Sequence, residues 1–299
     1  MALGAHLLGE ARLLLDARCT LGEGALWDAA RGTVWFVDIK QHHLWHYNPA
    51  TGSNTKAEAP GQIGWVIPAD DGRLLAGLKD GLWLFDPATQ TFERLRDIPG
   101  EPAHNRSNDA CTDPQGRVWL GTMDDAEAAP TGHFYRFDRG EVVRAGPSAI
   151  TITNGPAVNA EGTRIYFTDT LGQKILTADL GADGLPGPAR LFVDTALHFP
   201  DAYPDGPVVD ADGCVWTGLW NGWSAARFSP AGELIGQVML PLANVTQLAF
   251  GGPDLRTGFI TTARKGLDDA ALGAQPHAGG LFGFDAPVAG VAQARVRLG

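Results

Sequence analysis

The chain is poor in cysteine and in long apolar runs, and both shortages exclude classes of protein. Only three of its 299 residues are cysteines, widely spaced and without a C-x-x-C pair, so we expect neither a disulfide framework nor a cysteine zinc site. No window of 18 apolar residues occurs, which excludes a membrane-spanning helix. The first twenty residues lack the basic start of a signal peptide. We therefore expect a cytoplasmic protein with no membrane partner.

Positive charge and catalytic serine motifs are also scarce. The chain has 23 basic and 34 acidic residues, a net charge of −11, and no basic run reaches three residues. Such a chain is a poor partner for nucleic acid. G-x-S-x-G, H-E-x-x-H and P-loop motifs are all missing, which argues against a serine esterase, a zinc protease and a nucleotide hydrolase of those types. No feature indicates an obligatory protein partner.

Glycine, in contrast, is abundant, and much of it belongs to an internal repeat. An acidic residue or Asn, two spacers and a glycine precede an apolar run, as in DAARG-TVWFVD from Asp28 and DPQG-RVWLGT from Asp113. Six such turns occur at intervals of 40 to 51 residues, with glycines at Gly32, Gly72, Gly116, Gly162, Gly213 and Gly258. A further β-like run follows each turn. Units of this length with several short strands are typical of β-propeller blades.

The repeats predict an all-β fold, a six-bladed β-propeller formed by residues 1–299 as a single domain. The early run ARLLLDA, residues 11–17, precedes the first repeat and is expected to close the last blade, which would hide an exposed sheet edge. No helical periodicity competes with this interpretation. A β-sandwich or a parallel β-helix fits the long period less well.

One position per repeat is expected to face the central channel. It lies eight residues before the turn glycine, or nine in the first repeat, and equivalent positions of a propeller form a ring about its axis. The sixth register is uncertain and falls at Thr246 or Gln247. The other five positions hold Glu23, Gly64, Asn108, Asn154 and Asp205.

This ring offers two carboxylates and an amide oxygen from three different blades. Oxygen ligands with two negative charges suit a divalent cation such as Mg²⁺, Ca²⁺ or Mn²⁺. Three protein ligands leave positions open for water or substrate, as a catalytic site requires. The alternative is that these acidic and amide residues only cap turns, which recur in propellers anyway.

Several segments resemble the regucalcin/gluconolactonase family, also called senescence marker protein-like. They are LGEGALW, NRSNDACTDPQGRVWLGTM, ITNGPAV, YPDGPVVDADGCVW and the late GGLFGFD, in order over nearly the whole chain. The resemblance implies a six-bladed propeller with one divalent metal ion, held by Glu23, Asn154 and Asp205. It also implies that Arg106 and Asn108 contact substrate. Among the bacterial members, the chain resembles an aldonolactonase of the xylonolactonase type. An acidic residue of the family has no clean counterpart, and Asp125 and Glu127 are its candidates.

From the ring and the resemblance we expect metal-dependent hydrolysis of a sugar lactone to the aldonic acid, most simply of a pentonolactone such as xylonolactone. Asp205 is the expected catalytic residue, because it would touch both the cation and the attacking water. The identity of the ion, Fe²⁺, Mn²⁺, Zn²⁺, Mg²⁺ or Ca²⁺, stays open. Two alternatives also stay open: another metal-dependent ester or organophosphate hydrolase, and a calcium-binding propeller without catalysis. Three tryptophans, Trp65, Trp220 and Trp223, are candidates to line a sugar pocket.

Overall fold

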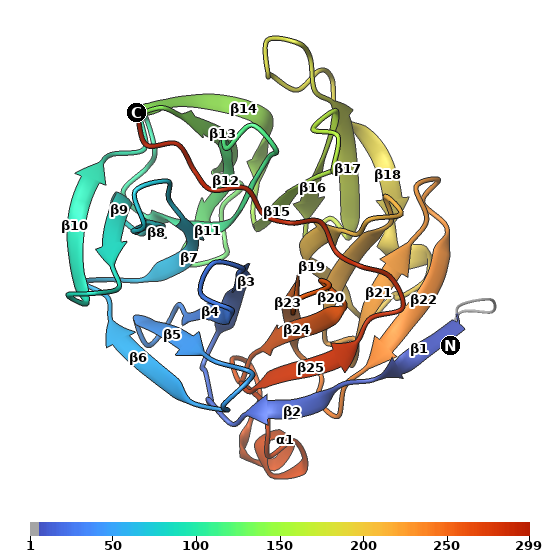
Figure 1. Cartoon of the computed structure of the whole chain (residues 1–299). Helices are drawn as coiled ribbons and strands as arrows, with labels where there is room; N and C mark the ends of the chain where they lie inside the picture. The colour runs from blue at the N-terminus through green and yellow to red at the C-terminus, as the bar shows by residue number, and fades with distance from the viewer. Residues whose placement is uncertain (1–5) are drawn as a thin grey trace.

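Six sheets surround a central axis in the computed structural model, which describes residues 6–299 (Figure 1). Each sheet is one blade, and its first strand lies nearest the axis. The predicted six-bladed β-propeller is therefore confirmed. The helical part is small: the 3₁₀ turn η1 (Thr195–Leu197) and the helix α1 (Asp269–Ala274). None of the helices in residues 6–299 has the length and apolar character needed to cross a membrane.

The blades follow one another along the chain. Blade I consists of β3 (Gly22–Asp28), β4 (Thr33–Asp38), β5 (His43–Tyr47) and β6 (Asn54–Glu58). Blade II consists of β7 (Ile63–Pro68), β8 (Leu74–Leu78), β9 (Gly81–Asp86) and β10 (Thr91–Arg96). Blade III consists of β11 (Asn105–Thr112), β12 (Val118–Asp124), β13 (Gly132–Asp138) and β14 (Glu141–Ile150).

The second half of the ring repeats this pattern. Blade IV consists of β15 (Thr153–Val158), β16 (Arg164–Asp169), β17 (Lys174–Asp179) and β18 (Arg190–Asp194). Blade V consists of β19 (Tyr203–Val209), β20 (Val215–Trp220), β21 (Ser224–Phe228) and β22 (Leu234–Met239). Blade VI consists of β23 (Val245–Gly251), β24 (Thr257–Thr262), β25 (Leu281–Asp285) and the early strand β2 (Arg12–Leu15).

The N-terminal part of the chain closes the ring in two ways. β2 pairs antiparallel with β25, which confirms that the early apolar run completes the last blade. The strand before it, β1 (His6–Glu10), pairs parallel with β22 and adds a fifth strand to blade V, which the repeats did not predict. The start of the chain thus binds two adjacent blades, and both would lose an edge partner without it.

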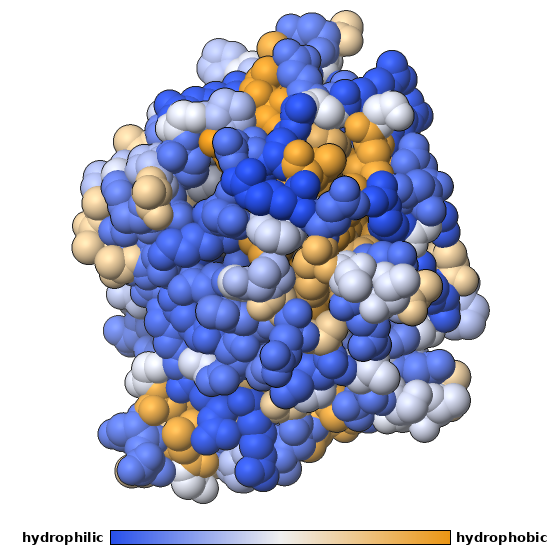
Figure 2. All heavy atoms as spheres, turned by 90° about the vertical axis from the view of Figure 1, so that its left-hand side faces the viewer, coloured by the Kyte–Doolittle hydropathy of each residue, from blue (hydrophilic) through white to orange (hydrophobic). Residues whose placement is uncertain are grey.

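Burial falls from the axis to the rim of each blade. The innermost strands β7 and β15 are buried along their whole length, whereas the outermost strands β6 and β10 are mostly exposed. Figure 2 shows a mainly hydrophilic surface on the side that carries β6 and β10. The apolar core therefore lies between the blades, and it fixes the position of the inner strands around the axis.

The last residues, 286–299, cross the ring at the end that carries the repeat turns (Figure 1). The amide of Ala211 donates to the carbonyl of Ala289 over 2.9 Å, and the amides of Asp70 and Val296 take part in a short parallel bridge. The Thr112 hydroxyl donates to the carbonyl of Ala294 over 2.8 Å. This C-terminal segment covers one end of the central channel, so the other end is where a ligand can enter.

Candidate functional site

A cavity of about 370 Å³ lies at the channel end away from the C-terminal segment. All five predicted site residues line it: Glu23, Arg106, Asn108, Asn154 and Asp205. They come from the innermost strands of blades I, III, IV and V, so residues up to 182 positions apart in the sequence face one space. The structure brings the predicted residues together, and their individual roles stay predictions.

A bulge in every innermost strand aims the ring residues into the channel. In each blade of residues 6–299 the pairing of the first two strands shifts register next to the ring position, for example between Glu23 and Leu26. Such bulges re-aim a side chain away from the regular alternation of a strand. Blade II contributes no side chain because a Cβ on Gly64 would lie 2.7 Å from the carbonyl oxygen of Asn108.

Glu23 and Asp205 are buried carboxylates that repel each other. They are 6% and 4% exposed, respectively. Burial raises the pKa of Glu23 well above its usual range, and the negative charges of Asp205 and Asp109 raise it further. Burial, followed by the charge of Asp109, raises the pKa of Asp205 to about 8. The Oδ1 atom of Asp205 has no hydrogen-bond partner within residues 6–299.

Asn154 is held in one orientation by its neighbours. The Thr170 hydroxyl donates to the carbonyl of Pro204 over 2.9 Å, so its oxygen is left to accept from Nδ2 of Asn154, also at 2.9 Å. The amide oxygen of Asn154 therefore points away from Thr170 and towards Asn108, whose Nδ2 donates to it over 2.9 Å. This fixes an oxygen, rather than an NH₂ group, at the ring position.

Asn108 links Asn154 to Arg106. Its Oδ1 accepts from Nη1 of Arg106 over 2.5 Å, and its Nδ2 donates both to Asn154 and to the carbonyl of Thr153. Arg106 is 2% exposed, and burial lowers its pKa, although nearby carboxylates oppose that effect. Both polar atoms of the Asn108 side chain thus bind protein atoms, and Asn108 connects Arg106 with Asn154 at the ring position.

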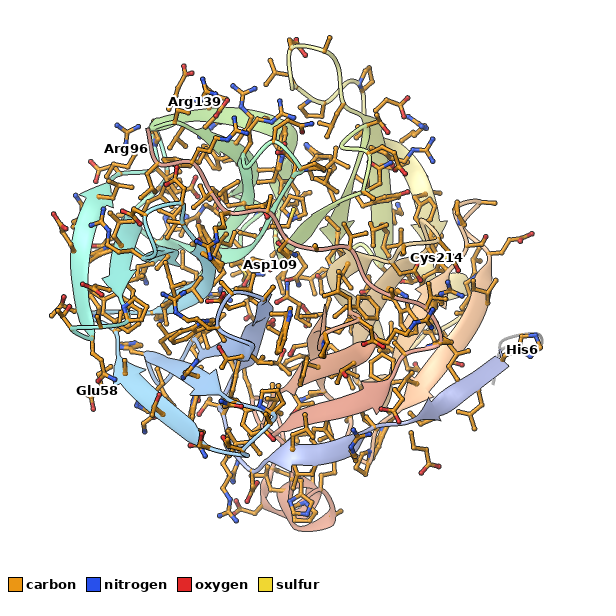
Figure 3. All side chains as sticks on the ribbon, in the orientation of Figure 1. His6, Glu58, Arg96, Asp109, Arg139 and Cys214 are labelled. Atoms are coloured by element: carbon orange, nitrogen blue, oxygen red, sulfur yellow. The ribbon has the colours of Figure 1, made fainter. Side chains whose placement is uncertain are left out.

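Asp109 lies near the axis, at the centre of the ring in Figure 3. Its carboxylate accepts from the amide of Gly155 over 2.7 Å and from Nε2 of Gln247 over 2.6 Å. Burial raises its pKa to about 6, and these hydrogen bonds oppose the rise. Blade VI, whose register the sequence left open, contributes the side-chain amide of Gln247, which supports Asp109. Neither Gln247 nor Thr246 lines the cavity. The adjacent residue Asn108 drew attention in the sequence, but nothing there distinguished Asp109.

The donor set fits a divalent cation. Three oxygen donors converge from three blades: the buried carboxylates of Glu23 and Asp205, whose pKa values are raised, and the oriented amide oxygen of Asn154. Burying the unpartnered carboxylate oxygen of Asp205 without a cation is costly. A bound cation would relieve both the burial cost and the mutual repulsion. In residues 6–299 no group of three His, Cys, Asp or Glu side chains is placed to hold a metal ion. A cation bound by Glu23 and Asp205 would therefore need a further ligand of another type, such as the amide oxygen of Asn154.

The two acidic candidates that the sequence left open differ in position. Glu127 lines the cavity and forms an ion pair with Lys265, which lines it from blade VI. Asp125 does not line this cavity, and instead pairs with Lys40 and Lys79. Glu127 is therefore the candidate that can reach a ligand directly. No sequence motif includes Lys265, because its partner Glu127 is 138 positions away in the sequence.

Only one of the three candidate tryptophans lines the cavity. Trp220, at the end of β20, does so together with Tyr203 and Leu171. Trp65 is buried, and its indole donates to the Ser107 hydroxyl over 2.7 Å. Trp223 is 42% exposed and does not line the cavity. The wall therefore combines a few apolar surfaces with hydrogen-bonding groups, as expected for a small polar ligand.

Comparisons with known proteins agree with this geometry. Residues 21–264, which include all five predicted site residues, match the family described as SMP-30/Gluconolactonase/LRE-like region. The chain is 35% identical to an L-arabinolactonase of Azospirillum brasilense, over 97% of this chain and 96% of that protein. It is 31% identical to a pentonolactonase of Haloferax volcanii, over 96% and 98%. A solved structure of a calcium-binding protein, regucalcin, from Agrobacterium tumefaciens has a TM-score of 0.93 at 31% identity, covering 98% and 100%.

Proposed function

The chain belongs to the SMP-30/gluconolactonase/LRE-like family of sugar lactone hydrolases, and we propose that it opens a pentonolactone such as xylonolactone to the aldonic acid. The observation that carries the proposal is the pair of buried carboxylates, Glu23 and Asp205, at the end of an open cavity. A volume of about 370 Å³ lies in the range of small-molecule sites, roughly 300–1,000 Å³. The two lactonases reported above support a five-carbon substrate.

We assign one divalent cation to Glu23, Asn154 and Asp205. When bound, such an ion supplies Lewis acidity that polarises the lactone carbonyl and acidifies a water molecule. The similarity to a calcium-binding regucalcin supports a divalent ion in general. The chain's own residues must do the rest: bind the sugar ring, orient the water and accept its proton.

Asp205 is the proton acceptor in this proposal. Its Oδ1 is buried and has no hydrogen-bond partner among residues 6–299, so it is available to a water at the cavity floor. A neighbouring cation lowers the pKa of a carboxylate, so Asp205 would be ionised at neutral pH although burial alone raises its pKa. An ionised carboxylate held against the water can orient it and take its proton in the transition state.

Arg106 is proposed to bind the lactone ring. Its Nη1 donates to Asn108, whereas Nε makes no hydrogen bond within residues 6–299, and Arg106 lines the cavity. The guanidinium can donate to the hydroxyl and ring oxygens of a neutral sugar lactone. Binding through several such donors holds the carbonyl carbon close to the water, which is the main benefit of positioning.

Acid release from a panel of lactones tests the proposal. Xylono-, arabinono- and gluconolactone are titrated at constant pH against a protein-free blank, because lactones open spontaneously. An aryl ester and an organophosphate in the same panel test the alternative hydrolases. We expect kcat/KM to be highest for a pentonolactone. Turnover of no aldonolactone above the blank contradicts the proposal.

A second candidate is a calcium-binding propeller without catalysis, which the similarity to regucalcin favours. The same carboxylates would hold the ion in that case. Calcium binding measured by calorimetry, together with a lactone panel at the blank rate, supports this candidate.

We also propose that the protein is cytoplasmic, because its three cysteines are free and buried in separate places.

A further inference from the structure

Asp125 joins three blades behind the cavity. Lys40 of blade I donates to its Oδ1 over 2.7 Å, and Lys79 of blade II donates to its Oδ2 over 2.8 Å. Nε2 of Gln62, also in blade II, donates to Oδ2 over 3.1 Å. Burial alone would raise the pKa of Asp125, but the hydrogen bonds from both lysines outweigh it and hold the pKa well below its usual range. Asp125 is thus a fixed negative charge.

The fourth neighbour of this carboxylate is Arg106. Nε of Arg106 lies 3.4 Å from Oδ1 of Asp125 and makes no hydrogen bond within residues 6–299. No other carboxylate in that part of the chain lies within 4.0 Å of the guanidinium. Asn108 holds the opposite side of the group through Nη1. The guanidinium is therefore held between an amide and a carboxylate, in a residue that lines the cavity.

We propose that Asp125 is a positioning residue, which holds the guanidinium of Arg106 in the orientation that binds substrate. The inference rests on the proposed function, because it assumes that Arg106 binds the lactone. Asp125 does not line the substrate cavity, so it acts through Arg106. A planar guanidinium gains affinity for a polar ligand only when its donors point in the right direction, and a charged neighbour at fixed position provides that direction.

The surroundings of Asp125 show why ion pairs, and not packing, determine its position. Gln62 and Lys79 line a second cavity of about 870 Å³ between blades II and III, whereas Arg106 lines the substrate cavity. Asp125 therefore lies in a wall between two spaces. Its backbone is held by one hydrogen bond, from its amide to the carbonyl of His104 over 3.1 Å. Without the lysines the carboxylate would be free to turn away from Arg106.

The lysines also explain why this carboxylate does not simply neutralise the arginine. Three cationic side chains share one carboxylate, so the cluster keeps a net positive charge beside a cavity that contains Glu23 and Asp205. The guanidinium consequently stays available to an oxygen-rich ligand instead of being consumed by a bidentate pair. An exposed salt bridge would be weak, but Arg106 is buried and Asp125 is only 19% exposed.

A double-mutant cycle tests this role, with Asp125→Asn and Arg106→Ala made singly and together. We expect Asp125→Asn to raise the KM for the lactone about three- to tenfold and to change kcat less than twofold, the pattern of lost ground-state binding. In the Arg106→Ala background the same change should have no further effect on KM. If Asp125 only clamped the blades together, Asp125→Asn would lower thermal stability equally in both backgrounds. Its effect on KM would then add to the effect of Arg106→Ala.

Conservative and matched variants complete the experiment. Asp125→Glu should recover most of the KM, and Asp179→Asn, which removes an exposed carboxylate paired with Arg190, should leave KM unchanged. If Asp125→Asn does not fold, Lys40→Met with Lys79→Met removes the anchors and should raise KM in the same way. Equal KM effects of Asp125→Asn with and without Arg106 overturn the inference alone. Wild-type kinetics of Arg106→Ala overturn it together with the proposed role of that arginine.

Discussion

The two ends of the innermost strands carry carboxylates in opposite situations. On blade V, Asp205 lies at the open end of the channel, and Asp210 lies five residues later at the end covered by the C-terminal segment. Asp210 Oδ2 accepts from Nε1 of Trp216 and from Nε of Arg227, both over 2.8 Å. Asp205 has no such partners, and its Oδ1 is unpaired within residues 6–299. The fold satisfies the carboxylate of Asp210, whereas it leaves an oxygen of the Asp205 carboxylate without a partner.

The covered end repeats this arrangement in alternate blades. In each case a turn aspartate accepts hydrogen bonds from an arginine and an indole of the same blade: Asp28 with Arg31 and Trp35, Asp113 with Arg117 and Trp119, Asp210 with Arg227 and Trp216. The turn aspartates at this end are therefore satisfied by side chains of their own blades. At the open end, Glu23 and Asp205 follow the same repeat without that pairing. Repetition alone does not identify a site. What distinguishes Asp205 is a buried carboxylate oxygen that has no hydrogen-bond partner within residues 6–299.

The largest expected effect separates these two ends by activity. Asp205→Asn keeps the shape and one oxygen but removes a negative charge and the proton acceptor, so kcat should fall about 10²- to 10⁴-fold. Asp210→Asn should leave kcat per folded molecule within about twofold, because its partners lie away from the cavity, and should instead lower the midpoint of unfolding. Steady-state kinetics and thermal unfolding of both variants give the comparison. Equal losses of kcat would contradict it.

The pH dependence of stability should also differ between the ends. Burial raises the pKa of Asp205 to about 8, from about 3.9 in an unfolded chain. A carboxyl group whose pKa is raised by folding contributes full stability below about pH 4, and this contribution is lost as the pH rises towards 8. Metal-free Asp205→Asn should therefore become more stable than metal-free wild type as the pH increases, by on the order of a few kcal/mol at pH 8.

Denaturant unfolding of both metal-free proteins at pH 5 and pH 8 checks this expectation. Saturating divalent cation should remove or reverse the advantage of the variant at pH 8, since only wild type keeps both carboxylate ligands. A stability difference that is independent of pH would show that Asp205 is already ionised and compensated within the fold.

Metal affinity provides a smaller contrast on blade I. Glu23→Gln removes one of two negative charges from the proposed cation site and should weaken binding at least about tenfold, a change of about 1.4 kcal/mol. Asp28→Asn removes a charge from the other end of the same strand and should leave metal affinity unchanged. Titration calorimetry on both variants measures this. Undiminished binding by Glu23→Gln would remove this residue from the site.

The smallest expected effects concern the substrate contacts. Arg106→Ala and Asn108→Ala should each reduce kcat/KM about tenfold, the scale of one lost hydrogen bond of roughly 0.5–1.5 kcal/mol. Asn108→Ala should in addition reduce metal affinity slightly, because Asn108 donates to the amide oxygen of Asn154. Kinetics and metal content measured on the same samples separate the two contributions. Wild-type kinetics in both variants would place these side chains outside the substrate site.

The fold was predictable because its signal is local and repeated. Each turn glycine marks one blade in the sequence. The number of residues from that glycine to the ring position predicted that Glu23, Asn154 and Asp205 lie together, and all three line one cavity. The parallel pairing of β1 with β22 and the C-terminal segment across the channel carry no local signal. Both are determined by which edges and which channel end remain open once the ring has formed.

The finer parts of the site depended on contacts between blades. Thr170 orients Asn154, and Lys265 pairs with Glu127, but no spacing in the sequence relates the members of either pair. The choice between Asp125 and Glu127 could be made only from the structure, because both follow the same strand two residues apart. Their side chains lie in different places: Asp125 pairs with lysines outside the cavity, whereas Glu127 lines the cavity.

The central claim is that the buried carboxylates of the open end, Glu23 and Asp205, hold a cation required for lactone hydrolysis. Its most direct test is the enzyme-catalysed rate, above the protein-free blank, of protein stripped with a chelator and of the same protein repleted with one ion at a time. Metal content is measured on every sample. The account predicts that activity falls to the blank when the metal is removed and returns in proportion to the bound ion. Unchanged lactone hydrolysis by fully metal-free protein would contradict it.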